Sequence, residues 1–425
     1  MSDQERSVSP AENAVHISGE NAASKTVLWL VTELYFPEET STGYYLTRIG
    51  EGLTDKFDVK VICGQPNYSA RGVRALKHEV LNDVEIFRVA GTGFNKNVIL
   101  FRLINMLTLS TSVFFRSVRS FSAKDRVLVV TTPPSLPFIA AFASKLRGAV
   151  YTLLVHDNYP EILIAAGKSR ENSLLVKILE FSNRWLYKHS SKIIAVGRDM
   201  RSKLEKKTNG LDIPITFIPN WAELETVHPM PRDDNKLLSE LGLLNKFVLL
   251  YAGNMGHPND IETIVSAAAE LQGSTDVHFI FLGAGAKEPW LKREIRELAL
   301  TNVTLLSPKP RSEQLTFLNA CDVALVSLVG KMLGVSMPSR TYNIMAAGKP
   351  ILALTDDNSE LAQVINEEGI GLYVRPGDKD MFLAAIERLR SNRSDLKAMS
   401  ERARAAALSK YSLDTAIAAY SNAIS

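Results

Sequence analysis

The chain has 425 residues, of which 46% are hydrophobic and 22% are charged. This is a globular composition, and the length predicts two core-forming domains. The net charge is only +3, and no compact patch alternates basic with aromatic residues, which argues against a nucleic-acid-binding protein.

No stretch reaches the roughly 18 consecutive apolar residues that a membrane-spanning helix needs. Residues 1–24 are polar and lack the apolar core of a signal peptide. We therefore expect a disordered tail at 1–24 and a cytoplasmic protein. Cys63 and Cys321 each lie in an apolar run, so buried, reduced thiols are expected rather than a disulfide or a metal site.

Apolar runs rich in β-branched residues, separated by helix-length segments, predict parallel sheets covered on both faces. In chain order the runs are KTVLWLVT, FDVKVICG, VEIFRVAG, RVLVVTT, VYTLLVHD, KIIAVG and ITFIPN, then FVLLYAGN, FIFLGAG, VTLLSP, DVALVSL and PILALT. The predicted fold is α/β, with two Rossmann-like, doubly wound parallel-sheet domains facing an interdomain cleft. Residues 209–240 are rich in Pro and Asn and lose periodicity, so they are the expected linker.

The expected domains are thus an N-terminal domain at 25–208 and a C-terminal domain at 241–405. Residues 1–208 hold 28 Lys and Arg against 20 Asp and Glu, whereas residues 209–425 hold 21 against 26. The basic first half suits an anionic membrane or a phosphorylated partner.

Ligands of open parallel sheets bind beyond the carboxyl ends of the strands. Gly43 follows the first strand and would let a ligand approach the backbone, although an ordinary turn explains it equally. His156 and Asp157 end the fifth strand of the first half. They could contact a sugar hydroxyl or act as acceptor or base; the alternative is a satisfied His beside a helix-capping Asp.

In the second half, Gly253, Asn254 and Gly256 lie between a strand and a helix, and Gly283 follows the next strand. We expect open backbone N–H groups there that bind a phosphate at a helix N-terminus. The spacing is not GxGxxG, so a dinucleotide fingerprint is absent. The glycines together favour a nucleotide.

Residues 337–350 read MPSRTYNIMAAGKP. Ser336 or Ser339 is the expected cap of a helix that ends near Gly348. Arg340 then falls in the first turn, where the helix dipole disfavours a cation unless an anion is present. A diphosphate clamped by Arg340 and the helix amides explains the Arg; a solvent-facing Arg is the alternative.

The motifs YFPEET, GYYLTRIGEGL, GQPNY, TTPP, HDNYPE, IPNW, YAGNMG and PSRTYNIMAAGKP occur in this order. Over roughly residues 25–410 the chain resembles the retaining Leloir glycosyltransferases of GT-B architecture, and is similar to the colanic-acid and exopolysaccharide enzymes of family 4. The resemblance implies a hexosyl or amino-sugar transferase of bacterial surface polysaccharide biosynthesis. It implies a UDP- or GDP-sugar as substrate, no cofactor and no essential metal. It also implies a C-terminal helix at 406–425 that crosses back to the first domain.

The resemblance also implies residue roles. It places catalytic roles on His156 and Arg340, and Asp157 joins them from its own place at a strand end. It places donor binding on Gly253, Asn254, Ser307, Pro308, Lys309, Arg340 and Asn343, and Gly43, Gly283 and Ser339 join them from their own places after strands or before a helix. The reaction it implies is a front-face transfer in which Arg340 stabilises the leaving diphosphate.

The chain departs from the family pattern at two places. Two glutamates that many relatives carry are replaced by Val335 and Asn343, of which Asn343 can still bond a ribose hydroxyl. A cation expected after Gly253 is missing, and the segment offers only His257. A non-catalytic nucleotide-sugar-binding subunit is therefore one alternative function, and a nucleotide-sugar epimerase of the same two-domain architecture is another.

Residues 94–126 combine an apolar face with Lys96, Arg102, Arg116, Arg119, Lys124 and Arg126 against the single acid Asp125. This pattern predicts peripheral contact with an anionic membrane at its inner, cytoplasmic face, and with it a lipid-linked or oligosaccharide acceptor. The alternative is a helix that covers the first sheet while its cations are merely solvated.

Overall fold

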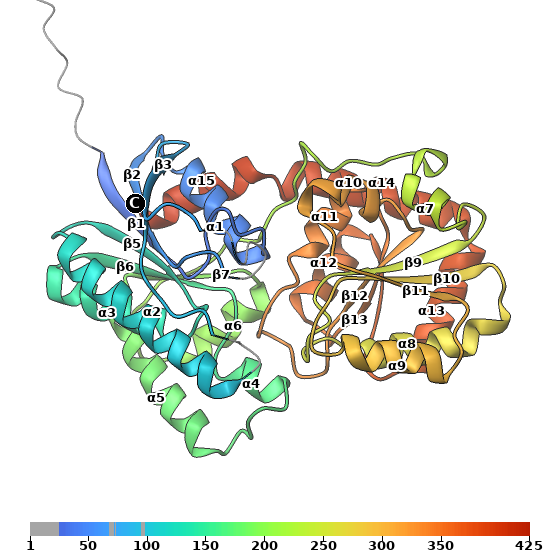
Figure 1. The fold of residues 1–425 in the computed structure, drawn as a ribbon, viewed down its shortest axis with the longest axis horizontal. Helices are drawn as coiled ribbons and strands as arrows, with labels where there is room; N and C mark the ends of the chain where they lie inside the picture. Colours follow the sequence, from blue (N-terminus) through green and yellow to red (C-terminus); the bar gives the residue numbers. More distant parts are fainter. Residues whose placement is uncertain (1–24, 68–71, 73, 95–97) are drawn as a thin grey trace, which may run out of the picture.

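The structure is a computed structural model that describes residues 25–67, 72, 74–94 and 98–425. The expected tail at 1–24 and the cation Lys96 lie outside the described residues. The described chain forms two lobes, each built around a sheet with helices on both faces (Figure 1). Together they have the GT-B arrangement of two Rossmann-like domains.

The first lobe contains an eight-stranded sheet in the order β3-β4-β2-β1-β5-β6-β7-β8, parallel except for the β3–β4 pair. Its elements are β1 (Thr26–Val31), α1 (Ser41–Gly52), β2 (Phe57–Cys63), β3 (His78–Leu81), β4 (Val84–Arg88), α2 (Ile99–Ser120), β5 (Arg126–Val130), α3 (Leu136–Arg147), β6 (Val150–Val155), α4 (Glu161–Ala165), α5 (Leu174–His189), β7 (Lys192–Ala195), α6 (Arg198–Lys207) and β8 (Ile215–Phe217).

The second lobe contains a six-stranded parallel sheet in the order β11-β10-β9-β12-β13-β14. Its elements are α7 (Lys236–Glu240), β9 (Phe247–Ala252), α8 (Ile261–Glu270), β10 (Val277–Leu282), α9 (Glu288–Glu297), β11 (Val303–Leu306), α10 (Gln314–Leu318), β12 (Val323–Ser327), α11 (Arg340–Ala346), β13 (Ile351–Leu354), α12 (Glu360–Glu368), β14 (Gly371–Val374), α13 (Lys379–Ser391) and α14 (Arg393–Lys410). The last helix of the chain is α15 (Leu413–Ile424).

The fold differs from the sequence expectation at three strands. β8 joins the first sheet, so the boundary expected at residue 208 is wrong and the first lobe extends into the segment expected as linker. β3 was not expected because it is an exposed edge strand without an apolar run. β14 was not expected because it is four residues long, begins with Gly and is mostly half-buried.

Helices α2, α3 and α5 cover one face of the first sheet, and α1 and α15 lie on the other (Figure 1). α15 follows the last helix of the second lobe, yet it packs on α1: a side chain at Gly52 would collide with Ile417. At its end, Arg126 Nη2 donates to the carbonyl of Ser425 over 2.7 Å. The C-terminal segment therefore ties the second lobe to the first.

The central strands are buried because both faces of each sheet carry helices. In β1 the last four residues are buried, and β12 is buried throughout. Cys63 and Cys321 are buried free thiols, as the apolar runs around them predict. No helix in the described part of the chain has the length and apolar character needed to cross a bilayer.

Candidate functional site

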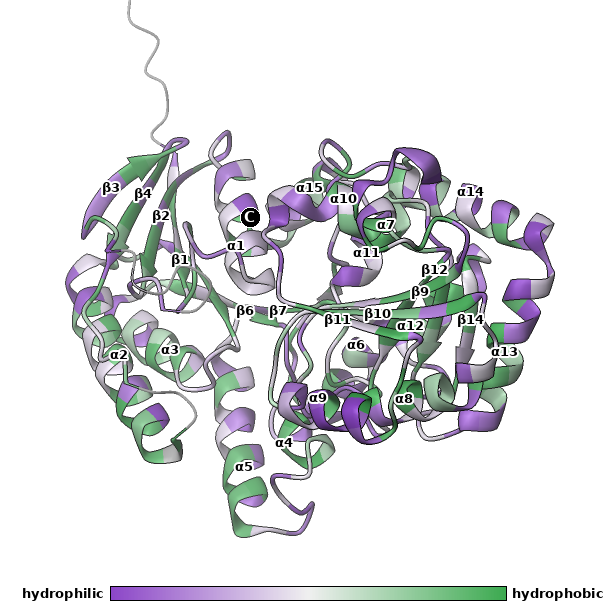
Figure 2. Cartoon of the chain, turned by 45° about the vertical axis from the view of Figure 1, so that its right-hand side comes forward, coloured by the Kyte–Doolittle hydropathy of each residue, from purple (hydrophilic) through white to green (hydrophobic). Residues whose placement is uncertain are grey.

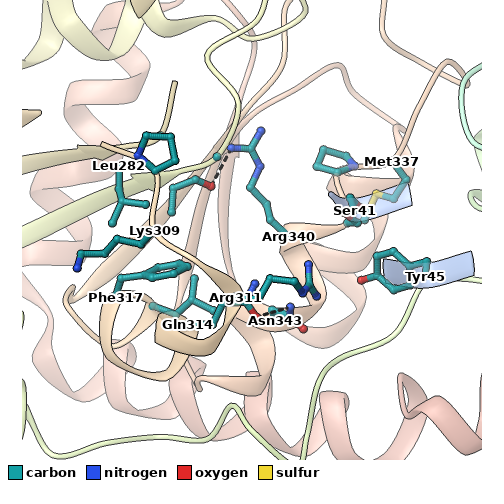
Figure 3. Close-up of a pocket in the computed structure, with 17 residues that line it drawn as sticks. Ser41, Tyr45, Leu282, Lys309, Arg311, Gln314, Phe317, Met337, Arg340 and Asn343 are labelled. Carbon is teal, nitrogen blue, oxygen red and sulfur yellow. Dashed lines mark hydrogen bonds between the residues drawn. The ribbon is translucent and has the colours of Figure 1, made fainter. Parts of the chain in front are cut away.

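A cavity of about 410 Å³ lies at the carboxyl ends of β9, β10 and β11, between the two lobes. In the second sheet β9 is flanked by β10 and β12, so the strand order reverses there, which is where such sheets bind ligands. The turn that leads into α11 forms one side, and α1 of the first lobe faces it. In Figure 3, Ser41 and Tyr45 lie opposite Lys309 and Phe317, with Arg311, Arg340 and Asn343 between them.

Arg340 is the first residue of α11, and its guanidinium is fixed over the end of β9. Nη1 donates to the carbonyl of Ala252 and Nη2 to Oδ1 of Asn259, both over 3.1 Å. The guanidinium carbon also lies 4.8 Å from the centroid of the Tyr251 ring. Both acceptors are neutral, and Arg340 makes no ion pair with any described residue. The cation therefore keeps its charge and three of its five N–H donors for a ligand.

The glycines after β9 and β10 have a different role from the expected one. Gly253 N–H donates to Leu282 O over 2.9 Å, and Gly283 N–H donates to Leu306 O over 3.0 Å. These two amides extend the sheet and are not open to a phosphate, so the expectation is wrong for Gly253 and Gly283. Gly253 instead makes room for Arg340: a Cβ there would lie 2.5 Å from Arg340 Nη1.

The helix after β9 does not offer a free N-terminus either. It begins at Ile261, and its cap residue Asp260 accepts from the backbone N–H of Thr263 over 3.0 Å. A carboxylate of the protein therefore occupies the place where an anion was expected.

The predicted N-cap position of Ser339 is confirmed, but the capping hydrogen bond expected from its hydroxyl is not formed. Ser339 has helical backbone angles there. Its hydroxyl lies 2.6 Å from the hydroxyl of Ser41 of α1, a hydrogen bond that joins the two lobes at the cavity. The expected end of the helix is confirmed: Gly348 has a φ of +62°, a left-handed conformation that favours glycine.

A second cluster joins Asn343, Arg311 and Glu223 at the base of the cavity. Asn343 Nδ2 donates to Glu223 Oε1 over 2.8 Å and to Gln314 Oε1 over 3.1 Å, while Glu223 N–H donates to Asn343 Oδ1 over 2.9 Å. Arg311 forms an ion pair with the same carboxylate. Glu223 lies in the segment expected as linker, so that segment contributes a carboxylate to the site.

Arg311 also contacts the first lobe. Its guanidinium carbon lies 3.7 Å from the centroid of the Tyr44 ring of α1. Burial lowers the pKa of the Arg311 guanidinium from its usual value. Lys309 is paired with Glu313 over 2.5 Å. Arg311 and Lys309 thus supply cations beside Arg340, where the sequence after Gly253 has only the exposed His257.

His156 and Asp157 lie in the loop after β6, which contacts the turn before α11. Asp157 forms an antiparallel bridge with Ser336, and Asn158 N–H donates to Val335 O over 2.9 Å. His156 Nε2 is buried without a hydrogen-bond partner among the described residues. Burial lowers the pKa of His156 to about 4 and raises that of Asp157 to about 6, so His156 is neutral at pH 7.

Seven of the predicted site residues line the cavity: Gly253, Gly283, Pro308, Lys309, Ser339, Arg340 and Asn343. Five do not: Gly43, Asn254, Ser307, His156 and Asp157. Gly43 is packed in the first turn of α1, where a side chain would collide with the carbonyl of Glu38. Asn254 and Ser307 are exposed. Val335 is fully buried against Leu328 and Met332, so no carboxylate faces the cavity from that position.

Sequence reasoning missed Ser41, Tyr45, Arg311 and Glu223. Arg311 is a cation two residues after Lys309, close to the end of a predicted strand, so the sequence could have identified it as a site residue. The sequence could not identify Glu223, because its position depends on the segment after β8 folding back against α11. Among the described residues there is no group of three or more His, Cys, Asp or Glu side chains able to hold a metal ion.

The cavity therefore combines three cations with hydrogen-bonding side chains and apolar walls. Its lining residues include no Asp or Glu. Glu223 and Glu313, which lie outside the lining, pair with Arg311 and Lys309, whereas Arg340 has no acidic partner in the described chain. This arrangement suits an anion with a polar, ring-bearing attachment, such as a nucleoside diphosphate.

Two family descriptions match the chain. "Glycosyl transferases group 1" matches residues 234–406, and "Glycosyl transferase 4-like domain" matches residues 41–221. The ranges correspond to the second and first lobes.

Two curated proteins are similar over most of the chain. "Probable glycosyltransferase WbjE" of Pseudomonas aeruginosa is 30% identical over 365 residues, which is 85% of this chain and 89% of that protein. "Putative colanic acid biosynthesis glycosyl transferase WcaI" of Escherichia coli strain K12 is 25% identical over 83% of this chain and 89% of that protein. Among solved structures, Anabaena Alr3699/HepE in complex with UDP superposes with a TM-score of 0.69 at 16% identity, over 93% of this chain and 98% of that one. HepE has also been solved with UDP-glucose.

Proposed function

The chain belongs to the group 1 glycosyltransferases, and from this we propose that it transfers a hexosyl or amino-sugar unit from a UDP- or GDP-sugar, with retention, to a lipid-linked glycan. The relative WcaI is named for colanic acid biosynthesis, which supports a role in a bacterial surface polysaccharide.

One observation supports the donor site above all others. The Arg340 guanidinium is held in the cavity by two neutral acceptors, with no ion pair among the described residues. Arg340 is only partly buried, yet a cation without a counter-ion in a cavity is unfavourable, and a bound diphosphate would remove that cost through charge-assisted hydrogen bonds. HepE, which shares the fold, binds UDP and UDP-glucose.

The proposed donor lies with its diphosphate between Arg340 and Lys309 and its ribose toward Asn343 and Glu223. Gln314 and Phe317 line the same end of the cavity and are the proposed neighbours of the base. The Glu223 carboxylate would supply a charged acceptor beside Asn343, whose own Oδ1 already accepts from the Glu223 N–H.

In the proposed reaction the acceptor hydroxyl attacks the anomeric carbon on the face from which the diphosphate leaves. The bond between that carbon and the phosphate oxygen breaks, and the acceptor proton passes to the departing phosphate. Arg340 stabilises the negative charge that develops on the leaving group. His156, neutral at pH 7, is proposed to donate or accept a hydrogen bond at the sugar rather than to act as a charged acid.

A panel of UDP- and GDP-sugars, incubated with the purified protein and a bacterial lipid extract, tests this proposal. We expect a glycosylated lipid whose new linkage has the anomeric configuration of the donor, as read by NMR. Arg340→Ala should lower kcat/KM by about 10²-fold or more, the loss typical of one charge-stabilising group.

Arg293→Ala on α9, an exposed guanidinium with no place in the cavity, is the matched control and should transfer normally. Inversion of the linkage would refute the retaining mechanism. Equal transfer by the Arg340→Ala enzyme and the wild type would refute the leaving-group role.

A further inference from the structure

The outer surface of α2, α3 and α5 is apolar to a degree that the fold does not require. On α5, Leu174, Ile178 and Phe181 recur at helical spacing, and Leu174 and Phe181 are 73% and 81% exposed. On α2, Leu103, Leu107 and Phe115 are also exposed. Figure 2 shows hydrophobic residues, in green, along these helices, and the exposure of those named above places them on the outer surface.

The three helices form one layer. Phe114 of α2 stacks on Phe142 of α3 with ring centroids 6.0 Å apart, and Lys145 of α3 lies 3.5 Å from His189 of α5. Phe142 is itself about half exposed. The apolar residues of the three helices therefore belong to one continuous side of the first lobe.

The same layer is strongly basic. Within the bounds of α2, α3 and α5 there are eight Lys or Arg residues and a single acid, Glu180. An acidic, water-soluble partner would account for the cations but not for the exposed Leu and Phe side chains. An anionic membrane accounts for both, because its phosphates attract the cations and its headgroup region accepts the apolar side chains.

A hollow of about 440 Å³ lies at the edge of this layer, beside the exposed Phe115. It is lined by Val89, Ala90, Ser112, Phe115, Arg116 and Arg119, with no acid among them. The Arg116 guanidinium carbon is held 3.9 Å from the centroid of the Phe87 ring. Its Nε is buried and has no hydrogen-bond partner in the described part of the chain, a rare condition for a charged donor.

We propose that the α2–α3–α5 surface docks on an anionic membrane, with the hollow between Arg116 and Arg119 holding the phosphate of a lipid headgroup. This inference names the surface that would bring the enzyme to the lipid-linked acceptor of the proposed function, and it rests on that function. Exposed Leu, Ile and Phe side chains enter the headgroup region while the flanking cations meet lipid phosphates. The surface would hold the cleft at the membrane that carries its acceptor.

Flotation with vesicles of phosphatidylcholine, with and without phosphatidylglycerol, tests the surface without any sugar donor or acceptor. The wild type should bind only the anionic vesicles, and salt should weaken the binding. Arg116→Gln/Arg119→Gln should weaken it about 30-fold, since each cation near an anionic leaflet contributes a factor of about five. Lys292→Gln/Arg293→Gln on α9 removes two charges from the second lobe and should bind as the wild type does.

Because Arg116 packs on Phe87, a second variant keeps the test independent of that contact. Ile178→Ser/Phe181→Ser changes only exposed side chains of α5 and should weaken vesicle binding about tenfold, with an unchanged thermal midpoint. Absence of vesicle binding by the wild type would overturn the proposal, even if the protein transfers sugar. A wild-type dimer that this second variant dissociates would overturn it in favour of a second copy. If inorganic phosphate raises the thermal midpoint but the protein does not bind vesicles, the hollow binds free phosphate and the membrane proposal is overturned.

Discussion

Gly253→Ala tests whether the Arg340 guanidinium can take its position only because residue 253, just after β9, has no side chain. Gly253 has a φ of +149°, a conformation that L-residues rarely adopt, and the added Cβ would lie 2.5 Å from Arg340 Nη1. Ordinary contacts begin at 3.4 Å, so the guanidinium must move by about 0.9 Å, the difference between the two distances. That movement strains its hydrogen bonds to Ala252 and Asn259.

A misplacement of about 1 Å at a reacting group can lower a rate by about 10²-fold. We therefore expect kcat/KM of Gly253→Ala to fall by about two orders of magnitude in a sugar-transfer assay. The strained backbone should also lower stability by about 1 to 3 kcal/mol.

Gly377→Ala separates the two effects. Gly377 also has a positive φ, of +84°, but a Cβ there would meet nothing within 4 Å. We expect this variant to lose stability and to transfer sugar at the wild-type rate. A folded Gly253→Ala enzyme with wild-type kcat/KM would refute the seating role of this glycine.

Two further predictions concern the buried charges. Glu223→Gln should lower the free energy of unfolding, measured with denaturant, by about 3 kcal/mol, because it leaves the Arg311 cation without its counter-ion. The double variant Glu223→Gln/Arg311→Gln should recover part of that loss. If the losses of the two single variants simply add, the two residues are not a coupled pair. Burial raises the pKa of Asp157 to about 6 from an ordinary 3.8, so its contribution to stability is present below pH 3.8 and is lost as the pH rises through 6. Asp157→Asn should therefore gain stability relative to the wild type as the pH rises from 4 to 6, and the gain should reach about 3 kcal/mol by pH 7. A constant difference across this range would show that the carboxyl is not the titrating group.

Most of the fold could be predicted because buried parallel strands are continuous apolar runs. β1, β9 and β12 are clear examples, and their positions alone implied two doubly wound sheets. β3 and β14 escaped because edge or half-buried strands need no such run. β8 was recognised as a strand but assigned wrongly, since its pairing with β7 is a long-range property.

The site was predictable where charge and chain position coincide. Arg340 stands out as a cation at the start of a helix, and the structure places it in the cavity. The glycine signal was misread: Gly253 and Gly283 adopt positive φ to allow close packing, while their amides complete the sheet. Glu223 was unpredictable, because a carboxylate in an aperiodic segment shows its partners only after folding.

The central claim is that Arg340 grips the diphosphate of a nucleotide, and calorimetric titration tests it most directly. UDP and uridine, and GDP and guanosine, should each be titrated into the wild type, Arg340→Gln and the control Arg293→Gln. The account predicts that Arg340→Gln weakens binding of the preferred nucleoside diphosphate by about 10- to 100-fold, the worth of a lost charged hydrogen bond, and leaves nucleoside binding unchanged. Equal affinity of the wild type and Arg340→Gln for the diphosphate would contradict it.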